Sequence, residues 1–253
     1  MALLIDGDVT TLRDLQDMDS TILETAKHEG IGLEGKVAIA TEQVQLEIAT
    51  FLLRTQAASI LPSTTGGYDL SRVVVTPALR RWHTLRVLVE VYSDAYNSQL
   101  NDRYLGKWKH FSTLARDASE ILFELGVGLV STPVRKAQRA TVTTAGGDGP
   151  PETYFVQTAW RGSQGASGAA SDIVSYDAAG GELIQVTPGV APAGVEGWDI
   201  YVSYAGEAPL RQNGSPIGLG QTWLLPVTGL VNGIPASEGQ QPDTHVRRSK
   251  AFF

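Results

Sequence analysis

The side chains that could support catalysis or bind a metal are the histidines and carboxylates, because the chain has 253 residues and no cysteine. Without cysteine, disulfides, thiolate zinc sites and thiol nucleophiles are excluded. The four histidines, His28, His83, His110 and His245, are far apart in sequence and form no His-x-x-x-His ligand pair. His83 and His110 are next to apolar helical positions, so we expect hydrogen-bonded or solvent-edge imidazoles there rather than metal ligands.

The short motifs of known chemistry are incomplete. Residues 30–35 are glycine-rich but lack the Lys-Ser/Thr end of a phosphate loop and the preceding strand of a dinucleotide fold. Residues 6–8 begin like a calcium loop but lack the ligands that should follow. Ser163, Ser167 and Ser171 lie in Gly/Ala-rich sequence without a Gly-x-Ser-x-Gly elbow. We therefore predict a protein that is not an enzyme and that uses no metal or cofactor.

The charge balance argues against a dedicated nucleic-acid binder. The chain has 20 Lys and Arg against 27 Asp and Glu, a formal net charge of −7. Nucleic-acid-binding domains usually carry a basic face, and neither half of this chain is basic. The first residues lack the pattern of a signal peptide, and no stretch approaches the roughly 20 apolar residues of a membrane helix. We expect synthesis in the cytoplasm and no membrane partner.

The composition predicts two parts. Of the 27 glycines, 9 lie at or before Gly128 and 18 lie after it. Helix formers dominate the first part, and Thr, Val, Gly and Pro dominate the second. We predict an α+β protein made of an all-helical domain (1–135), an all-β immunoglobulin-like or fibronectin-like sandwich (136–235) and an extended C-terminal arm (236–253).

Apolar spacing predicts three long helices. The first begins near Glu34 and carries apolar residues at intervals of three or four through Phe51, and the second begins at Thr76-Pro77, a capping hydroxyl followed by proline. The third has the clearest seam and is expected to end at Gly126. Its seam residues are Tyr104, Trp108, Phe111, Ala115, Ala118, Leu122 and Leu125.

The second part shows period-two alternation between turn signals, which is typical of short antiparallel strands. The predicted strands are residues 140–144, 153–160, 172–176, 182–187, 197–204 and 222–225, with a possible edge strand at 216–219. Trp160, Trp198 and Trp223 lie in these runs and are expected to belong to the core.

Two stretches resemble known proteins. Residues 15–53 and 82–108, with Leu-Glu-Thr-Ala-Lys-His-Glu-Gly-Ile at 23–31, Val-Tyr-Ser-Asp-Ala-Tyr-Asn at 91–97, and the closing residues 126–133, resemble the helical core of tailed-bacteriophage head–tail connector (adaptor) proteins. Gly-Trp-Asp-Ile-Tyr-Val at 197–202 and Trp-Leu-Leu-Pro at 223–226 are similar to the fibronectin type III or immunoglobulin-like modules of phage virion proteins.

The resemblance implies a structural virion protein at the neck, in a homo-oligomeric, twelvefold ring under the portal protein. Such a ring extends the DNA channel without sequence-specific DNA binding and joins the capsid to tail components. Carboxylates lining the channel would repel the DNA backbone, and DNA could then slide. The candidate lumen-facing acids are Asp94, Asp102, Glu120 and Glu124. The candidate residues of the arm that docks on the portal or a neighbouring subunit are Arg247, Arg248, Lys250, Phe252 and Phe253.

Two alternatives stay open at this point. The same parts would suit a tail or baseplate protein, with a different oligomer symmetry. They would also suit a carbohydrate- or protein-binding β-sandwich with a helical spacer, which would need an exposed aromatic platform on the β part.

Overall fold

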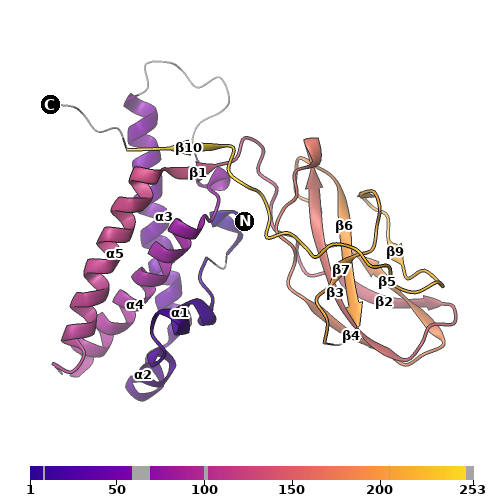
Figure 1. The fold of residues 1–253 in the computed structure, drawn as a ribbon, viewed down its shortest axis with the longest axis horizontal. Helices are drawn as coiled ribbons and strands as arrows, with labels where there is room; N and C mark the ends of the chain where they lie inside the picture. The colour runs from indigo at the N-terminus through magenta and orange to yellow at the C-terminus, as the bar shows by residue number, and fades with distance from the viewer. Residues whose placement is uncertain (8, 59–68, 100–101, 205, 249–253) are drawn as a thin grey trace. The chain divides into compact units, whose positions relative to one another are not determined.

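The computed structural model describes residues 1–7, 9–58, 69–99, 102–204 and 206–248 (Figure 1). It is an α+β protein, with five α-helices in the described N-terminal half and a β-sheet region in the C-terminal half. The chain divides into two compact units. Of the described residues, the helical unit contains 7–131 and 242–248, and the β unit contains 1–6 and 132–241.

This division differs from the predicted boundaries at both ends of the chain. Asp6 belongs to the β unit, where its carboxylate accepts hydrogen bonds from Arg135 Nε at 2.8 Å and Lys136 N at 3.0 Å. At the other end, residues 242–248 belong to the helical unit. Both placements depend on pairing between segments far apart in sequence, which composition does not encode.

The α-helices begin and end largely where the local signals predict. Their bounds are α1 (Leu12–Met18), α2 (Ile22–Glu29), α3 (Leu33–Ala58), α4 (Pro77–Gln99) and α5 (Leu105–Leu125), with 3-10 turns at Leu4–Asp6, Leu70–Arg72 and Ser163–Gly165. Before α4, the Thr76 hydroxyl accepts a hydrogen bond from Leu79 N at 3.3 Å. Gly126 follows α5 with φ of 109°, a conformation that glycine adopts readily. Helix α1, which we did not predict, begins with a capping box between Thr11 and Asp14.

Helices α3 and α4 run antiparallel. Lys36, near the start of α3, lies 2.7 Å from Asp94 in the last third of α4. Further along α3, Glu47 lies 3.6 Å from Arg86 in the first half of α4. The buried face of α3 is formed by Ala40, Val44, Ile48 and Leu52.

Helices α4 and α5 also run antiparallel, so α3 and α5 run in the same direction. The Tyr96 and Trp108 rings stack at a centroid distance of 5.6 Å. At the other end of the pair, Trp82 meets Phe123 edge-on at 5.7 Å. Most of the predicted α5 seam is buried in this contact, but Leu125 is 57% exposed. The prediction for Leu125 is wrong: it is the last residue of α5, and its side chain stays in water.

The C-terminal segment closes the helical unit. Strand β10 (Thr244–Val246) pairs antiparallel with β1 (Val127–Leu129), directly after α5. The predicted extended arm at 236–253 therefore does not extend over its described part, which packs on its own chain. Residues 249–253, with Lys250, Phe252 and Phe253, lie outside the described residues.

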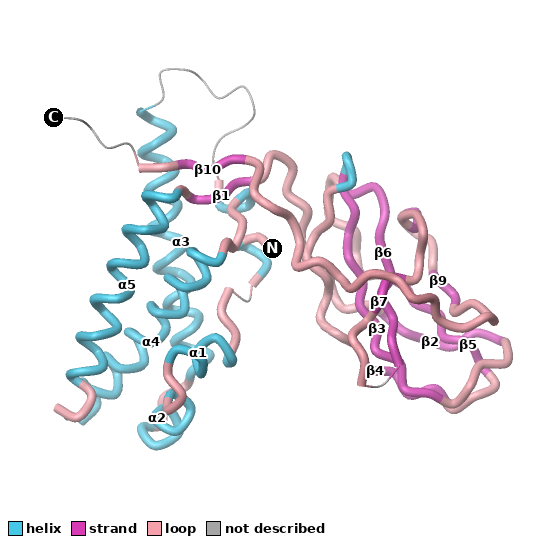
Figure 2. The backbone as a smooth tube through the Cα atoms, viewed as in Figure 1, coloured by secondary structure: helices cyan, strands magenta, loops and turns pink. Residues whose placement is uncertain are grey.

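The β unit contains two sheets, one with strand order β2-β5-β9 and one with β4-β3-β6-β7, in which β8 also pairs with β6. All of these pairings are antiparallel. The strand bounds are β2 (Thr141–Gly146), β3 (Glu152–Gly162), β4 (Val174–Ala178), β5 (Glu182–Thr187), β6 (Val195–Tyr204), β7 (Leu210–Arg211), β8 (Ile217–Gly218) and β9 (Trp223–Leu224). The chain between β9 and β10 is mostly loop (Figure 2).

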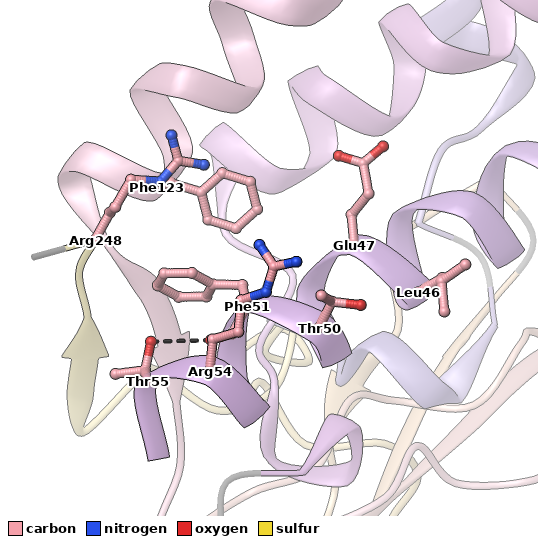
Figure 3. Close-up of a pocket in the computed structure, with 8 residues that line it drawn as sticks. All are labelled: Leu46, Glu47, Thr50, Phe51, Arg54, Thr55, Phe123 and Arg248. Carbon is pink, nitrogen blue, oxygen red and sulfur yellow. Dashed lines mark hydrogen bonds between the residues drawn. The ribbon is translucent and has the colours of Figure 1, made fainter. Parts of the chain in front are cut away.

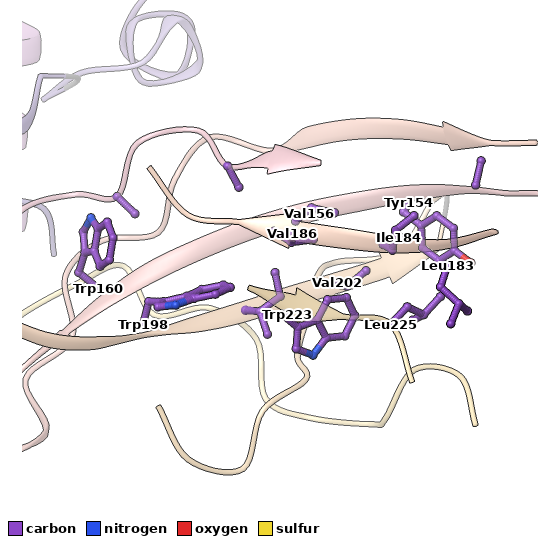
Figure 4. Packing of buried hydrophobic residues seen from close by; sticks show 14 of the residues in the cluster. Tyr154, Val156, Trp160, Leu183, Ile184, Val186, Trp198, Val202, Trp223 and Leu225 are labelled. Carbon is purple, nitrogen blue, oxygen red and sulfur yellow. The ribbon is translucent and has the colours of Figure 1, made fainter. Parts of the chain in front are cut away.

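Both sheets contribute to one hydrophobic core (Figure 4). Trp160 and Trp198 come from the larger sheet, and Ile184, Val186 and Trp223 come from the smaller one. Alternating residues of both central strands face this core, as the pattern predicts: Tyr154, Val156 and Trp160 on β3, and Trp198, Ile200 and Val202 on β6. Because the two sheets share one core, we expect them to fold as a single unit.

The central strand β6 is buried on its second face as well. Asp199, Tyr201 and Ser203 are at most 3% exposed, although period-two alternation usually leaves such a face in water. Asn213, from the segment after β7, covers part of this face, since its side-chain oxygen accepts a hydrogen bond from Ile200 N at 3.0 Å. A buried polar face of this kind requires partners, which are described below.

Candidate functional site

A pocket of about 630 Å³ lies in the helical unit, between the C-terminal halves of α3 and α5 (Figure 3). Residues from α3, α5 and the segment after β10 line it. They are Leu46, Glu47, Thr50, Phe51, Arg54, Thr55, Phe123 and Arg248.

One wall of the pocket is aromatic. The Phe51 and Phe123 rings lie 4.7 Å apart at an interplanar angle of 48°. The Arg248 guanidinium lies 5.0 Å from the Phe123 ring centroid, within the range of a cation–π contact. Arg248 is also held by its backbone, since its N donates to Phe123 O at 2.9 Å. The C-terminal segment thus completes a wall begun by two helices.

The charges around the pocket are mainly positive. Arg54 and Arg248 are on the lining, and the single lining carboxylate, Glu47, has Arg86 at 3.6 Å. Guanidinium groups bind carboxylates in a planar, two-bonded geometry. The arrangement can therefore hold an apolar or aromatic group that has an anionic group beside it. Nothing in the sequence patterns indicated this pocket, because its walls come from three segments far apart in the chain.

The predicted arm residues that the structure describes bind to α5 of their own chain. Arg247 Nε donates to Leu125 O at 3.0 Å, and Arg248 N bonds to Phe123 O as described above. The last carbonyls of a helix lack internal partners, so these two donors stabilise the end of α5. In this structure both arginines hold the C-terminal segment in place.

The predicted lumen acids fall into two groups. Asp102 precedes α5 and Asp94 lies on α4, whereas Glu120 and Glu124 are one turn apart near the other end of α5. A helix of this length spans about 30 Å, so Glu120 and Glu124 lie far from Asp102 at the start of α5. Asp94 forms the ion pair with Lys36, and the other three acids are exposed.

His83 is fully buried in a cluster of threonines. Its Nδ1 lies 2.7 Å from Thr10 Oγ1, and its Nε2 lies 2.9 Å from Thr41 Oγ1. We expected a hydrogen-bonded or solvent-edge histidine here, and His83 is hydrogen-bonded. Burial lowers its pKa from 6.5 to about 4, so the ring is neutral at pH 7.

A second polar cluster joins the start of α2 to α4 and α5. The Asp19 carboxylate accepts hydrogen bonds from Lys107 Nζ at 2.7 Å and from the Tyr92 hydroxyl. Burial raises the pKa of Asp19, but the bonds from Lys107, Tyr92 and Thr21 outweigh it and bring the pKa below its ordinary value. The cluster fixes the position of α2, and sequence spacing gave no sign of it.

A third cluster lies on the second face of β6. Asp199 is completely buried between Arg161, on β3, and Arg211, on β7, whose Nη2 lies 3.5 Å from the carboxylate. Asn213 Nδ2 donates to the same carboxylate at 2.8 Å. Two cations and an amide satisfy this buried acid, and the pattern is that of a structural ion cluster.

Other site types find no support in the described residues. Within them, no group of three or more His, Cys, Asp or Glu side chains is arranged to hold a metal ion. Likewise, no described helix has both the length and the apolarity to cross a membrane. Trp160, Trp198 and Trp223 are at most 8% exposed, so they form no aromatic platform for a sugar.

Comparison with models of protein families and with curated proteins gives no match for this chain.

Proposed function

We propose that the protein is a structural connector of a tailed bacteriophage, an adaptor that forms a ring under the portal and joins capsid to tail. In this proposal the helical unit corresponds to the adaptor core and the β unit to an immunoglobulin-like module. The protein would be made in the host cytoplasm and reside at the neck of the virion. The basis for the family is the sequence resemblance, carried by residues 15–53, 82–108 and 126–133.

One structural observation carries the assembly role. The helical unit has large, exposed apolar side chains on two long helices, with Leu46 70% exposed on α3 and Ile121 53% exposed on α5. Exposed apolar side chains arranged in rows are typical of surfaces that bind other proteins. This observation favours a protein that works by association over a free-standing binding module.

The net negative charge of the chain suits a channel through which DNA passes. With a net charge of −7, the chain offers little attraction to the phosphate backbone, and a ring of such chains would let DNA slide. In the proposed ring some of Asp94, Asp102, Glu120 and Glu124 face the channel. Substituting each by Lys and measuring particle assembly and DNA retention tests this, and normal retention in all four variants contradicts it.

We propose a docking role for the last residues of the C-terminal arm, 249–253. Gln240 is tied to residues 132–134, since its side-chain oxygen accepts from Val134 N at 2.6 Å and its Nε2 donates to Thr132 O at 2.8 Å. Removing everything from Ser237 would therefore damage both units. A chain truncated after Arg248 is the informative variant: we expect it to fold normally and to lose attachment to portals.

Electron cryomicroscopy of the protein mixed with portals from its own source tests the whole proposal. We expect a twelvefold ring below the portal. A ring of another symmetry, or one located elsewhere in the tail, would indicate a tail or baseplate protein. Absence of any binding, with a stable monomer in solution, would contradict a connector.

A further inference from the structure

The pocket in the helical unit is lined by one side of α3 (Figure 3). The lining residues of α3 come as three neighbouring pairs, each four residues after the pair before it. Positions four apart lie on the same side of a helix, so the three pairs form one wall. The pairs are Leu46 with Glu47, Thr50 with Phe51, and Arg54 with Thr55. The sequence of α3 thus places a leucine, an aromatic ring and a cation along a single wall.

The pocket contains two cations without a matching anion in the described part of the chain. No described carboxylate forms an ion pair with the guanidinium of Arg54 or of Arg248. The lining carboxylate, Glu47, has Arg86 at 3.6 Å, so a cation outside the lining already faces it. Arg248 is fixed in place, because its guanidinium lies 5.0 Å from the Phe123 ring and its backbone N bonds to Phe123 O. A guanidinium held beside aromatic rings favours a ligand that joins an aromatic group to an anion.

The size and exposure of the pocket indicate the kind of ligand. Its volume of about 630 Å³ lies within the range of ligand sites. A small-molecule site buries most of its ligand, but here Leu46 on the lining is 70% exposed and Arg54 is exposed as well. A free small molecule would therefore stay partly in water. A segment of a partner protein can insert one side chain and cover the exposed leucine with its backbone.

We propose that this pocket binds a segment of a partner protein in which an aromatic residue stands next to Asp or Glu. The aromatic ring packs on Phe51 and Phe123. The carboxylate pairs with Arg54 and Arg248, whose planar guanidinium groups match its geometry, and the segment covers Leu46. The site goes beyond the connector role and does not depend on it, because its ligand is defined by the ring and the charge alone.

Three small probes separate the ring from the charge. N-acetylphenylalanine has both, its amide has only the ring, and acetate has only the charge. In NMR spectra of the isotope-labelled full chain, N-acetylphenylalanine should move the Nε–H signals of Arg54 and Arg248, with a dissociation constant on the order of 1 mM. The amide and acetate should bind at least about threefold more weakly. Arg247, whose Nε donates to Leu125 O at 3.0 Å, is the internal control and its signal should stay in place.

Two capped peptides distinguish a protein segment from a free small molecule. Acetyl-Gly-Phe-Glu-Gly-amide has one carboxylate, on a side chain, and its counterpart with Gln in place of Glu has none. The Glu peptide should bind about threefold or more tighter than N-acetylphenylalanine, because its backbone also covers Leu46, and the Gln peptide should lose this gain. Tighter binding of N-acetylphenylalanine than of the Glu peptide would overturn the partner segment and indicate a free aromatic acid.

The variant Arg54→Gln tests the site within the protein. Arg54 is exposed, so the fold should be unchanged, and the Glu peptide should bind about threefold more weakly while the Gln peptide binds as before. Arg81→Gln removes an exposed arginine of α4 that is not on the lining; it is the matched control and should change neither affinity.

The remaining outcomes each decide one part of the proposal. Equal binding of the two peptides would overturn the role of the arginines. No shift at Arg54 or Arg248 with the probes at about tenfold the expected dissociation constant would overturn the site itself. Phe252→Ser/Phe253→Ser should leave the affinity unchanged; a several-fold rise would mean that the chain's own last residues compete for the pocket, which would overturn a partner as its occupant. Electron cryomicroscopy with portals bears on the connector role alone, so the two proposals can fail separately.

Discussion

The two units differ in where their exposed apolar side chains lie. In the β unit they are scattered, as with Val190 and Val227, which lie in loops and are 81% and 84% exposed. In the helical unit they follow the helix repeat on α3 and α5. Single exposed apolar residues are ordinary on protein surfaces, whereas ordered rows are not. This contrast is the reason for placing the proposed assembly surface on the helical unit.

The units also differ in how they bury charge. The β unit surrounds Asp199 with two arginines inside a sheet, whereas the helical unit buries a neutral His83 among hydroxyls. At these two sites the β unit is therefore sensitive to removal of a charge and the helical unit to addition of one. Each of the following predictions tests one side of this contrast, from the largest expected effect to the smallest.

Replacing Asp199 should damage the β unit most. In Asp199→Ala, Arg161 and Arg211 keep partly buried charges without their shared counter-ion, a loss of about 3–5 kcal/mol in unfolding free energy. Hydrogen-exchange mass spectrometry should show lost protection in β3 and β6 and unchanged protection in α4. The exposed Glu196 of the same strand is the control, as Glu196→Ala. Equal loss in both units would mean that they do not unfold independently.

Neighbouring residues on opposite sides of α5 should behave very differently. Phe123→Ala removes a buried ring and should cost about 3–5 kcal/mol. Ile121→Ala, two residues earlier but facing outward, should change stability by less than about 0.5 kcal/mol. Urea unfolding followed by circular dichroism measures both. A large cost at Ile121 would mean that its side chain is covered within one chain and is not part of an assembly surface.

His83 should make the helical unit sensitive to acid. Unfolded histidine takes up a proton below its ordinary pKa of 6.5, whereas the buried ring stays neutral to about pH 4. The unfolded state therefore binds more protons in this window, and stability falls as the pH drops from 6.5 towards 4. The total loss is about 3 kcal/mol.

Urea titrations at several pH values test this. His83→Gln should be less stable at pH 7 but should lose this slope, whereas His110→Asn, on the exposed side of α5, should keep it. An unchanged slope in His83→Gln would assign the acid sensitivity to other groups.

The ion pair between Lys36 and Asp94 should matter least for stability. Both side chains are partly in water, and pairs of this kind contribute about 0–1 kcal/mol. Asp94→Ala should therefore leave the thermal midpoint nearly unchanged and make it less dependent on salt. Any strong effect of this variant on particle assembly would then reflect a contact outside the single chain.

The sequence by itself determined the local architecture. Apolar intervals of three and four gave α3 and α5, Thr76-Pro77 gave the start of α4, and alternation gave six of the strands within a few residues. These features follow from neighbours in the chain, because helix and strand repeats act over a few residues. The composition excluded thiol chemistry, because the chain contains no cysteine.

Only the tertiary structure decided which unit each terminus joins, which residues pair with His83 and Asp199, and which side of α5 is exposed. Each depends on contacts between segments far apart in sequence. Leu125 illustrates the limit: its spacing places it on the buried seam, yet its side chain remains in water. A repeat specifies the direction of a side chain, but only packing specifies what covers it.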